Sequence, residues 1–207
     1  MPTLPLKHLE STVGDAPAAL HTRAIADLRF IRETMARATS YTAFSGWGLM
    51  VVGCGALIAG LVASREAALV NRLSIWLADA GLSVFVGAIS AALKARAWEQ
   101  PLFGGPIRKF SLSFAPAIMA GAVLTAFILR SGSASLLPGL WLLLYGAGLA
   151  AAGTLSVWVI PFMGACFFAL GVIALSGPAA WANSLLIAGF AGVHIISGAV
   201  IARRYGG

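Results

Sequence analysis

Six long apolar segments constrain the fold of this chain more than any other feature of its sequence. They cover residues 44–63, 73–93, 110–129, 136–152, 155–175 and 180–202. Each approaches the length of roughly 20 residues at which a helix crosses the hydrocarbon core of a bilayer. The backbone of such a segment finds no water there and must satisfy its own amide groups, as a helix does. The pattern therefore predicts an all-α fold, a polytopic membrane bundle of six transmembrane helices over residues 41–204.

The composition fits lipid rather than water as the surrounding solvent. Only 10% of the residues are charged and 59% are hydrophobic, whereas about 25% of the residues in a soluble domain are charged. In a soluble protein the net charge of +7 would suggest nucleic acid as a partner. Here the basic residues flank apolar segments and orient them in the bilayer. We therefore expect the lipid bilayer as the partner, and no nucleic acid.

The distribution of Lys and Arg predicts the orientation of the bundle. If the N-terminus is cytoplasmic, only three of the 14 basic residues lie in outer loops, namely Arg65, Arg72 and Arg130. Because cytoplasmic loops carry the excess of Lys and Arg, both termini are predicted to be cytoplasmic. The first forty residues contain no apolar stretch followed by a small-residue cleavage site, so no cleavable signal peptide is expected.

The N-terminal forty residues are predicted to form two segments outside the bundle. Residues 1–14 show no periodicity and are expected to be a mobile tail. Residues 15–40 are expected to form an amphipathic helix, because apolar residues recur at spacings of three and four and basic residues occupy the other face. Such a helix lies in the cytoplasmic interface or docks on a protein. The residues expected to contact a cytoplasmic partner or anionic lipid are Arg23, Arg29, Arg32, Arg37 and, in the loop 94–109, Trp98.

Small residues recur at regular spacings on several of the apolar segments. They are Gly46, Gly53 and Gly60, Gly146 and Gly153, Gly164 and Gly171, and the pair Ala188 and Gly192. Lipid removes most of the hydrophobic drive for helices to associate, so small residues that allow close approach take over. We interpret these positions as packing grooves, with a substrate path as the alternative.

A faint internal repeat suggests how the helices are arranged. Each of the three outward-running segments contains a Met followed within three residues by Gly. Each returning segment carries a Trp near its outer end, at Trp76, Trp141 and Trp181, where aromatic rings prefer the headgroup level. The pattern predicts three like-oriented helical hairpins, with chance similarity between apolar segments as the alternative.

Parts of the chain resemble known membrane proteins. The stretch Met163-Gly-Ala-Cys-Phe-Phe-Ala-Leu-Gly171, then Gly177-Pro178, then Ala188-Gly-Phe-Ala-Gly-Val-His-Ile-Ile-Ser-Gly198 resembles the hairpin of the bacterial acid-resistance inner-membrane proteins, which are built of duplicated helical hairpins. The whole chain resembles uncharacterised bacterial six-helix membrane proteins with an Arg-rich first helix, through residues 28–35, 137–146 and 202–207. The resemblance implies the inner (plasma) membrane of a bacterium as the location, and it transfers no catalytic or ligand residue.

Polar residues within the predicted spans are candidates for function, because polar groups are costly in hydrocarbon. Asp79 is the only acid in a span, and it either takes up a proton or is an interfacial residue that reaches the headgroups or pairs with Arg72 or Asn183. His194 lies in the sixth segment, where a backbone carbonyl or a serine would satisfy it. A membrane haem normally needs two facing histidines, and the spans contain one.

Sulfur-containing residues form the other candidate site. Met50 and Cys54 are four residues apart, and Met163 and Cys166 are three apart, so each pair shares a helix face. Soft sulfur ligands select Cu(I), but Met and Cys also fill apolar cores, and we predict no cofactor. The sequence contains no His-Glu-x-x-His motif, no Gly-x-Ser-x-Gly elbow and no phosphate-binding glycine loop with Lys. An enzyme is therefore not expected.

Two functions follow from these features. The first is a non-enzymatic scaffold or sensor that engages a cytoplasmic partner or anionic lipid through the basic N-terminal helix. The alternative is a small transporter or channel for protons, a metal ion or a small solute, which would use Asp79 and His194. A cavity that reaches either residue would favour the alternative. The oligomeric state is left open, with a homo-oligomer among the alternatives.

Overall fold

The computed structural model describes residues 23–31, 45–97, 105–154 and 156–205. Over these residues the chain is helical and contains no strand, which confirms the predicted all-α class for this part. Six of its helices are long and apolar enough to cross a membrane, over Gly46–Ala63, Leu69–Lys94, Ile107–Arg130, Ala134–Gly153, Val159–Ser176 and Ala179–Tyr205. These six helices indicate a multi-pass membrane protein.

Some spans consist of one element and others of several in sequence. The first three are α2 (Gly46–Ala63), α3 (Leu69–Ala97) and α4 (Gly105–Arg130). The 3₁₀ turn η2 (Ala134–Leu136) leads into α5 (Leu137–Gly153), and α6 (Val159–Ser176) follows. The sixth span, called the last helix below, joins the 3₁₀ turn η3 (Ala179–Trp181), α7 (Ala182–Leu186), the π-helical segment η4 (Ile187–Val193) and α8 (His194–Tyr205).

Two helices begin before the apolar segments that predicted them. α3 begins at Leu69, whereas its apolar segment begins at residue 73, and α4 begins at Gly105, whereas its segment begins at residue 110. The added turns carry polar and basic side chains, Arg72 among them. A helix continues beyond the hydrocarbon core wherever such side chains reach the polar interface. The length of an apolar segment in the sequence therefore underestimates the length of the helix that contains it.

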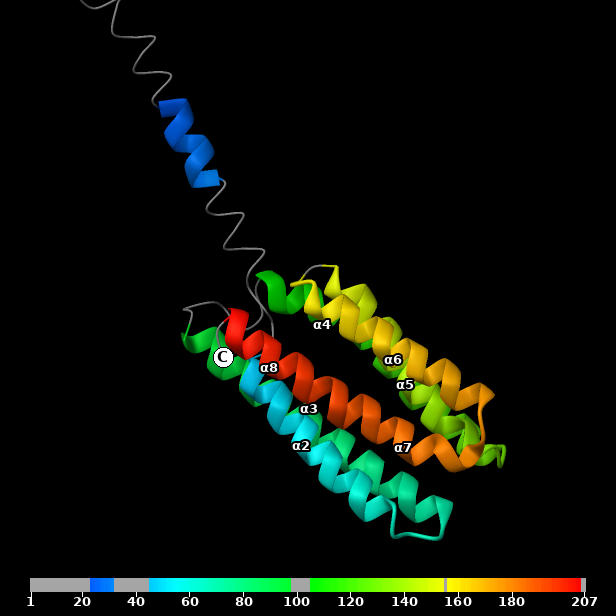
Figure 1. The fold of residues 1–207 in the computed structure, drawn as a ribbon. Coiled ribbons are helices and arrows are strands. Elements are labelled where there is room, and N and C mark those ends of the chain that lie inside the picture. Colours follow the sequence, from blue (N-terminus) through cyan, green and yellow to red (C-terminus); the bar gives the residue numbers. More distant parts are fainter. Residues whose placement is uncertain (1–22, 32–44, 98–104, 155, 206–207) are drawn as a thin grey trace, which may run out of the picture. The chain divides into compact units, whose positions relative to one another are not determined.

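The spanning helices form two groups (Figure 1). In the first, α2 packs against α3 and the last helix, and in the second, α5 packs against α4 and α6. α6 contacts the last helix much less than it contacts α5, so the predicted third hairpin is not a closely packed pair. The arrangement as three like-oriented hairpins is thus not confirmed.

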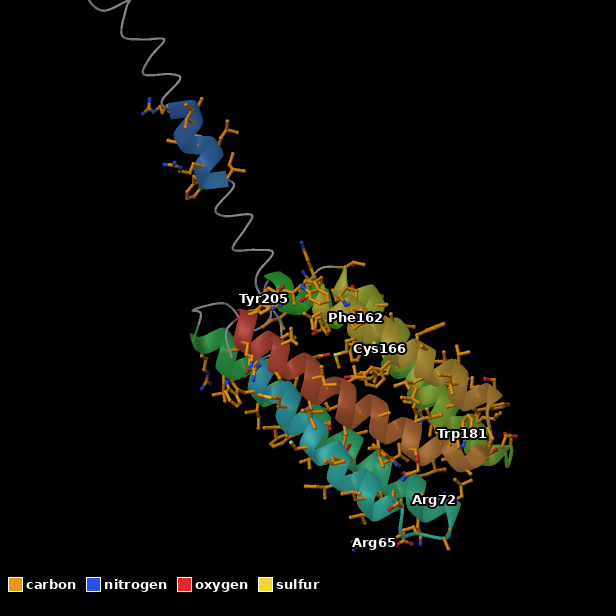
Figure 2. All side chains as sticks on the ribbon, viewed as in Figure 1. Arg65, Arg72, Phe162, Cys166, Trp181 and Tyr205 are labelled. Carbon is orange, nitrogen blue, oxygen red and sulfur yellow. The ribbon has the colours of Figure 1, made fainter. Side chains whose placement is uncertain are left out.

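The two ends of the bundle carry the residues on which the orientation prediction depends. Figure 2 shows Arg65, Arg72 and Trp181 at one end and Phe162 and Tyr205 at the other. Arg203 and Arg204 immediately precede Tyr205 at that second end. The cytoplasmic location of the second end stays a prediction.

Glycine allows α5 and α6 to approach until their backbones touch. A Cβ atom added to Gly146 would lie 2.7 Å from the carbonyl oxygen of Gly164, and one added to Gly164 would lie 2.8 Å from that of Gly146. Gly171 meets the backbone of Gly139 in the same way, at 3.0 Å. Real Cβ atoms essentially never come closer than 3.0 Å to such groups. The predicted packing groove of the fourth and fifth segments is therefore present.

Close backbone contacts at glycine also join α2 to the last helix. A Cβ atom on Gly198 would lie 2.7 Å from the carbonyl oxygen of Gly46, and one on Gly53 would lie 3.0 Å from that of Ala191. The pair predicted on the sixth segment behaves differently, because nothing lies within 4 Å of a Cβ on Gly192 and Ala188 is exposed. The packing face of the last helix instead contains Gly198, since that face is determined by the position of α2.

The N-terminal forty residues form a unit of their own. Of the predicted helix 15–40, residues 23–31 are described, and they are helical with exposed side chains, including Arg23 and Arg29. The predicted tail 1–14 and the predicted contact residues Arg32, Arg37 and Trp98 lie outside the described residues. The full extent of the amphipathic helix and its contacts therefore remain predictions.

Candidate functional site: a cavity between the helix groups

A cavity with a volume of about 610 Å³ lies between the two groups of helices. α3 supplies one wall and α4 the other, while side chains of α2, α5, α6 and the last helix complete the lining. α3 and α4 are also the least buried of the six spanning helices. Ligand pockets for drug-sized molecules occupy roughly 300 to 1,000 Å³. The space is therefore large enough for a small organic molecule.

The cavity extends along the helices and opens sideways between α3 and α4. On α3 its lining residues recur at spacings of three and four from Trp76 to Ser90, a distance of about 21 Å at 1.5 Å per residue. Two of the lining residues, Val84 on α3 and Met119 on α4, are also exposed on the surface. Because these helices are apolar spans, the opening faces the region that lipid would occupy.

Asp79 lines this cavity from α3. Asp79 lies about 15 Å along α3 from Leu69 and about 9 Å from residue 73, where the apolar segment begins. Its Oδ1 atom faces α2 at Gly55, where an added Cβ would lie 3.3 Å away. No described residue forms a hydrogen bond or ion pair with Asp79, so the alternative in which it pairs with Arg72 or Asn183 is not found among the described residues.

Asn183 has other partners. Its side-chain oxygen accepts a hydrogen bond from Trp76 Nε1 at 2.9 Å, and its side-chain nitrogen donates to the carbonyl oxygen of Gly60 at 3.1 Å. Asn183 thus ties α3 and α2 to the start of the last helix. Its side-chain oxygen and nitrogen both form hydrogen bonds within the bundle, and it does not line the cavity.

His194 is buried, with 1% of its surface exposed, and still contributes to the cavity lining. Its Nε2 atom lies 2.9 Å from the hydroxyl oxygen of Tyr145 on α5. The predicted partners were a backbone carbonyl or a serine, so the main partner differs from the expectation. The other ring nitrogen, Nδ1, is buried and forms no hydrogen bond with the described residues.

Aromatic rings surround this histidine–tyrosine pair. The ring of His194 lies 5.4 Å from that of Phe167 and 6.1 Å from that of Phe190, and the ring of Tyr145 lies 5.3 Å from that of Phe114. Phe190 belongs to the π-helical segment η4, which ends one residue before His194. π-helical turns inside α-helices occur frequently at functional sites. Here the turn places both Phe190 and His194 in the lining.

Two tryptophans expected at the membrane interface are part of the cavity wall. Trp76 is buried and bonded to Asn183, and Trp141 donates its Nε1–H to Thr125 on α4 at 2.8 Å. A buried indole N–H needs a hydrogen-bond partner, and a partner on another helix holds it inside the bundle. Only Trp181 of the predicted three remains exposed, as an interfacial residue would be.

The sulfur-containing candidates are not brought together. Met163 lines the cavity, but Met50 packs against Gly198 on the last helix and Cys54 is exposed. Figure 2 shows Cys166 on α6, and this residue is not part of the lining. Among the described residues no three His, Cys, Asp or Glu side chains are grouped as a metal site. The two pairs fail to converge because Met50 and Cys54 lie on faces of α2 that do not line the cavity.

Tyr145 is the main site residue that the sequence analysis missed. It is the only tyrosine inside the predicted spans, and a tyrosine hydroxyl in hydrocarbon usually finds a partner. This signal could have linked it to His194, the only histidine in a span.

Comparison with known protein families, with curated proteins and with solved structures finds no match to this chain. The two resemblances therefore remain expectations, and the site is interpreted from its geometry.

Proposed function

We propose that this chain is a small membrane transport protein that binds its solute in the cavity between the two helix groups. The observation that carries the proposal is the convergence of Asp79 and His194 on one cavity within the spans. Intramembrane ionisable residues that face a cavity commonly mark a solute or proton pathway. The cavity thereby favours the transport alternative over a purely structural bundle.

The packing suggests how such a protein would move. Within each group, glycine faces bring backbones into contact, as at Gly146 with Gly164 and at Gly46 with Gly198. Contacts between the groups are fewer and involve mainly the last helix against α5 and α6. Many transporters expose a central site to each side of the membrane in turn by rocking one rigid bundle against another. We propose the same motion for these two groups.

The scaffold or sensor role stays a separate prediction. It is motivated by residues 23–31, a helix on which the apolar Leu28 and Ile31 are exposed together with Arg23 and Arg29. A cytoplasmic partner or anionic lipid would cover such a surface. This role would regulate or anchor the protein and does not compete with transport through the cavity.

Thiol labelling tests whether the cavity is reached by water from both sides. Ala122→Cys places a thiol on the cavity-lining face of α4, and Val123→Cys places one on its exposed, non-lining face. Both are made after replacing Cys54 and Cys166 with alanine. The thiolate is the reactive form and needs water. We therefore expect a charged methanethiosulfonate reagent to label the Ala122→Cys variant at least about tenfold faster than the Val123→Cys variant.

The sidedness of the labelling decides between transport and a one-sided pocket. In vesicles of either orientation, the thiol introduced by Ala122→Cys should react with reagent added outside. Reaction from one side alone would contradict alternating access, and reaction no faster than that of the Val123→Cys thiol would contradict a hydrated cavity.

A further inference from the structure

The described lining of the cavity contains an acidic residue and no lysine or arginine. Of the described residues that line it, Asp79 is the only acid and none is Lys or Arg. The other ionisable lining residues, His194 and Tyr145, are hydrogen-bonded to each other. Asp79 has no such partner among the described residues. The cavity therefore offers one carboxylate with no positive protein group to neutralise it.

We infer that the solute is an organic monocation with an apolar body, such as a hydrophobic ammonium or phosphonium ion, and that Asp79 is its counter-ion. The inference rests on the proposed transport function and specifies its substrate class. Once a bound solute displaces water from the apolar cavity, the carboxylate is stable only when it is protonated or paired with a positive charge. A monocation supplies that charge while its apolar surface fills the remaining space.

The rest of the lining suits the same class of solute. Trp76, Phe114, Trp141 and Tyr145 present aromatic side chains to the cavity. Aromatic faces attract cations through the ring quadrupole, most strongly when water is excluded. Ser83 follows Asp79 by four residues and lines the same wall, so its hydroxyl adds a polar contact near the charge.

Other classes of solute fit less well. A calcium ion requires six to eight oxygen ligands and magnesium requires near-octahedral coordination, whereas the described residues contain no grouping of three acidic, His or Cys side chains. An anion would meet the carboxylate of Asp79 without any basic lining residue to bind it. A neutral molecule would bind only while Asp79 is protonated, and the charge of the carboxylate would then have no part in binding. The organic monocation is the class that satisfies both the charge and the apolar lining.

Proton competition follows from the same arrangement. Since a proton and an organic cation neutralise the same carboxylate, binding of the cation should release a proton from Asp79, and acidic solution should weaken cation binding. The neighbouring helix α2 presents Gly55 to Asp79, and its one titratable side chain, Cys54, is exposed outside the lining. Across the cavity the titratable groups are Tyr145 and His194. Cation–proton exchange at Asp79 would couple transport to the proton gradient.

Equilibrium dialysis of the full-length protein in detergent against radiolabelled tetraphenylphosphonium tests the inference. We expect saturable binding that is weakened about tenfold or more by Asp79→Asn and only a few-fold by Asp79→Glu, because the second change keeps the charge. Tetraphenylborate, an anion of similar shape, should not compete. Affinity should fall in acidic solution for the wild type and stay constant for Asp79→Asn.

Controls keep the outcomes distinct. Glu66→Gln removes an acid in the connection between α2 and α3, where Glu66 accepts a hydrogen bond from Asn71, and it should bind like the wild type. Thermal unfolding of Asp79→Asn shows whether the variant is folded. Equal affinity of a folded Asp79→Asn, or no binding by the wild type, would overturn the cation assignment. The labelling of the Ala122→Cys variant tests the transport proposal without using a cation. Failure of the transport proposal is therefore distinguished from failure of the cation assignment.

Discussion

Replacing Gly146 with alanine is expected to lower the free energy of unfolding by about 1 to 3 kcal/mol, the usual cost of inserting a methyl group into a packed interior. The new Cβ would lie 2.5 Å from the backbone nitrogen of Phe168 and 2.7 Å from the carbonyl oxygen of Gly164. Both obstacles are backbone atoms of α6, so relief requires the two helices to move apart. The effect is measured by thermal unfolding in detergent, with loss of the monodisperse elution peak as the signal.

A matched glycine separates packing from helix propensity. In a helix interior alanine is favoured over glycine by about 1 kcal/mol, so propensity alone predicts stabilisation. Gly81 on α3 has no atom within 4 Å of an added Cβ, and Gly81→Ala should leave stability unchanged or raise it. Gly164→Ala should resemble Gly146→Ala, because Gly164 meets the backbone of Gly146 and Ala150. If Gly146→Ala proved as stable as Gly81→Ala, the close approach of α5 and α6 would be refuted.

Tyr145→Phe removes the tyrosine hydroxyl and is expected to lower the free energy of unfolding by about 1 to 3 kcal/mol, because it leaves a buried histidine nitrogen without its hydrogen-bond partner. The hydroxyl lies 2.9 Å from Nε2 of His194, which is 1% exposed and enclosed by aromatic rings. His194→Leu should have a similar cost, because it leaves the tyrosine hydroxyl unsatisfied. The double variant should be more stable than the sum of the two losses predicts, because no unpaired polar group remains.

The thermodynamic cycle of Tyr145→Phe and His194→Leu is measured by the same thermal unfolding. Tyr205→Phe is the control, since Tyr205 lies at the end of the bundle and its hydroxyl forms no hydrogen bond with the described residues. It should leave stability nearly unchanged. Strictly additive losses for the two cavity variants would show that the hydrogen bond between them contributes nothing to stability.

Much of the candidate site could be found before the structure was known. Asp79 and His194 stood out because ionisable groups are costly in hydrocarbon, and both line the cavity. The sulfur pairs had helical spacings of four and three residues, yet of their four members only Met163 lines the cavity. Spacing along one helix indicates which side chains share a face, but it does not indicate which other helix that face meets.

The roles of Trp76 and Tyr145 depend on contacts between distant parts of the chain. Trp76 bonds to Asn183, which is 107 residues away, and Tyr145 bonds to His194, 49 residues away. An aromatic residue near the end of an apolar segment is ordinarily interfacial. Its burial here depends on a partner that only the folded bundle brings into reach.

The sequence by itself determined the helical class and the six spans, because each segment must satisfy its backbone hydrogen bonds within itself once water is removed. The tertiary structure alone decided that α2 pairs with the last helix, that α5 pairs with α6, and that a cavity remains between the two groups. Those pairings depend on how closely glycine lets particular backbones approach. Many apolar segments offer small residues, and only the three-dimensional fit selects among them.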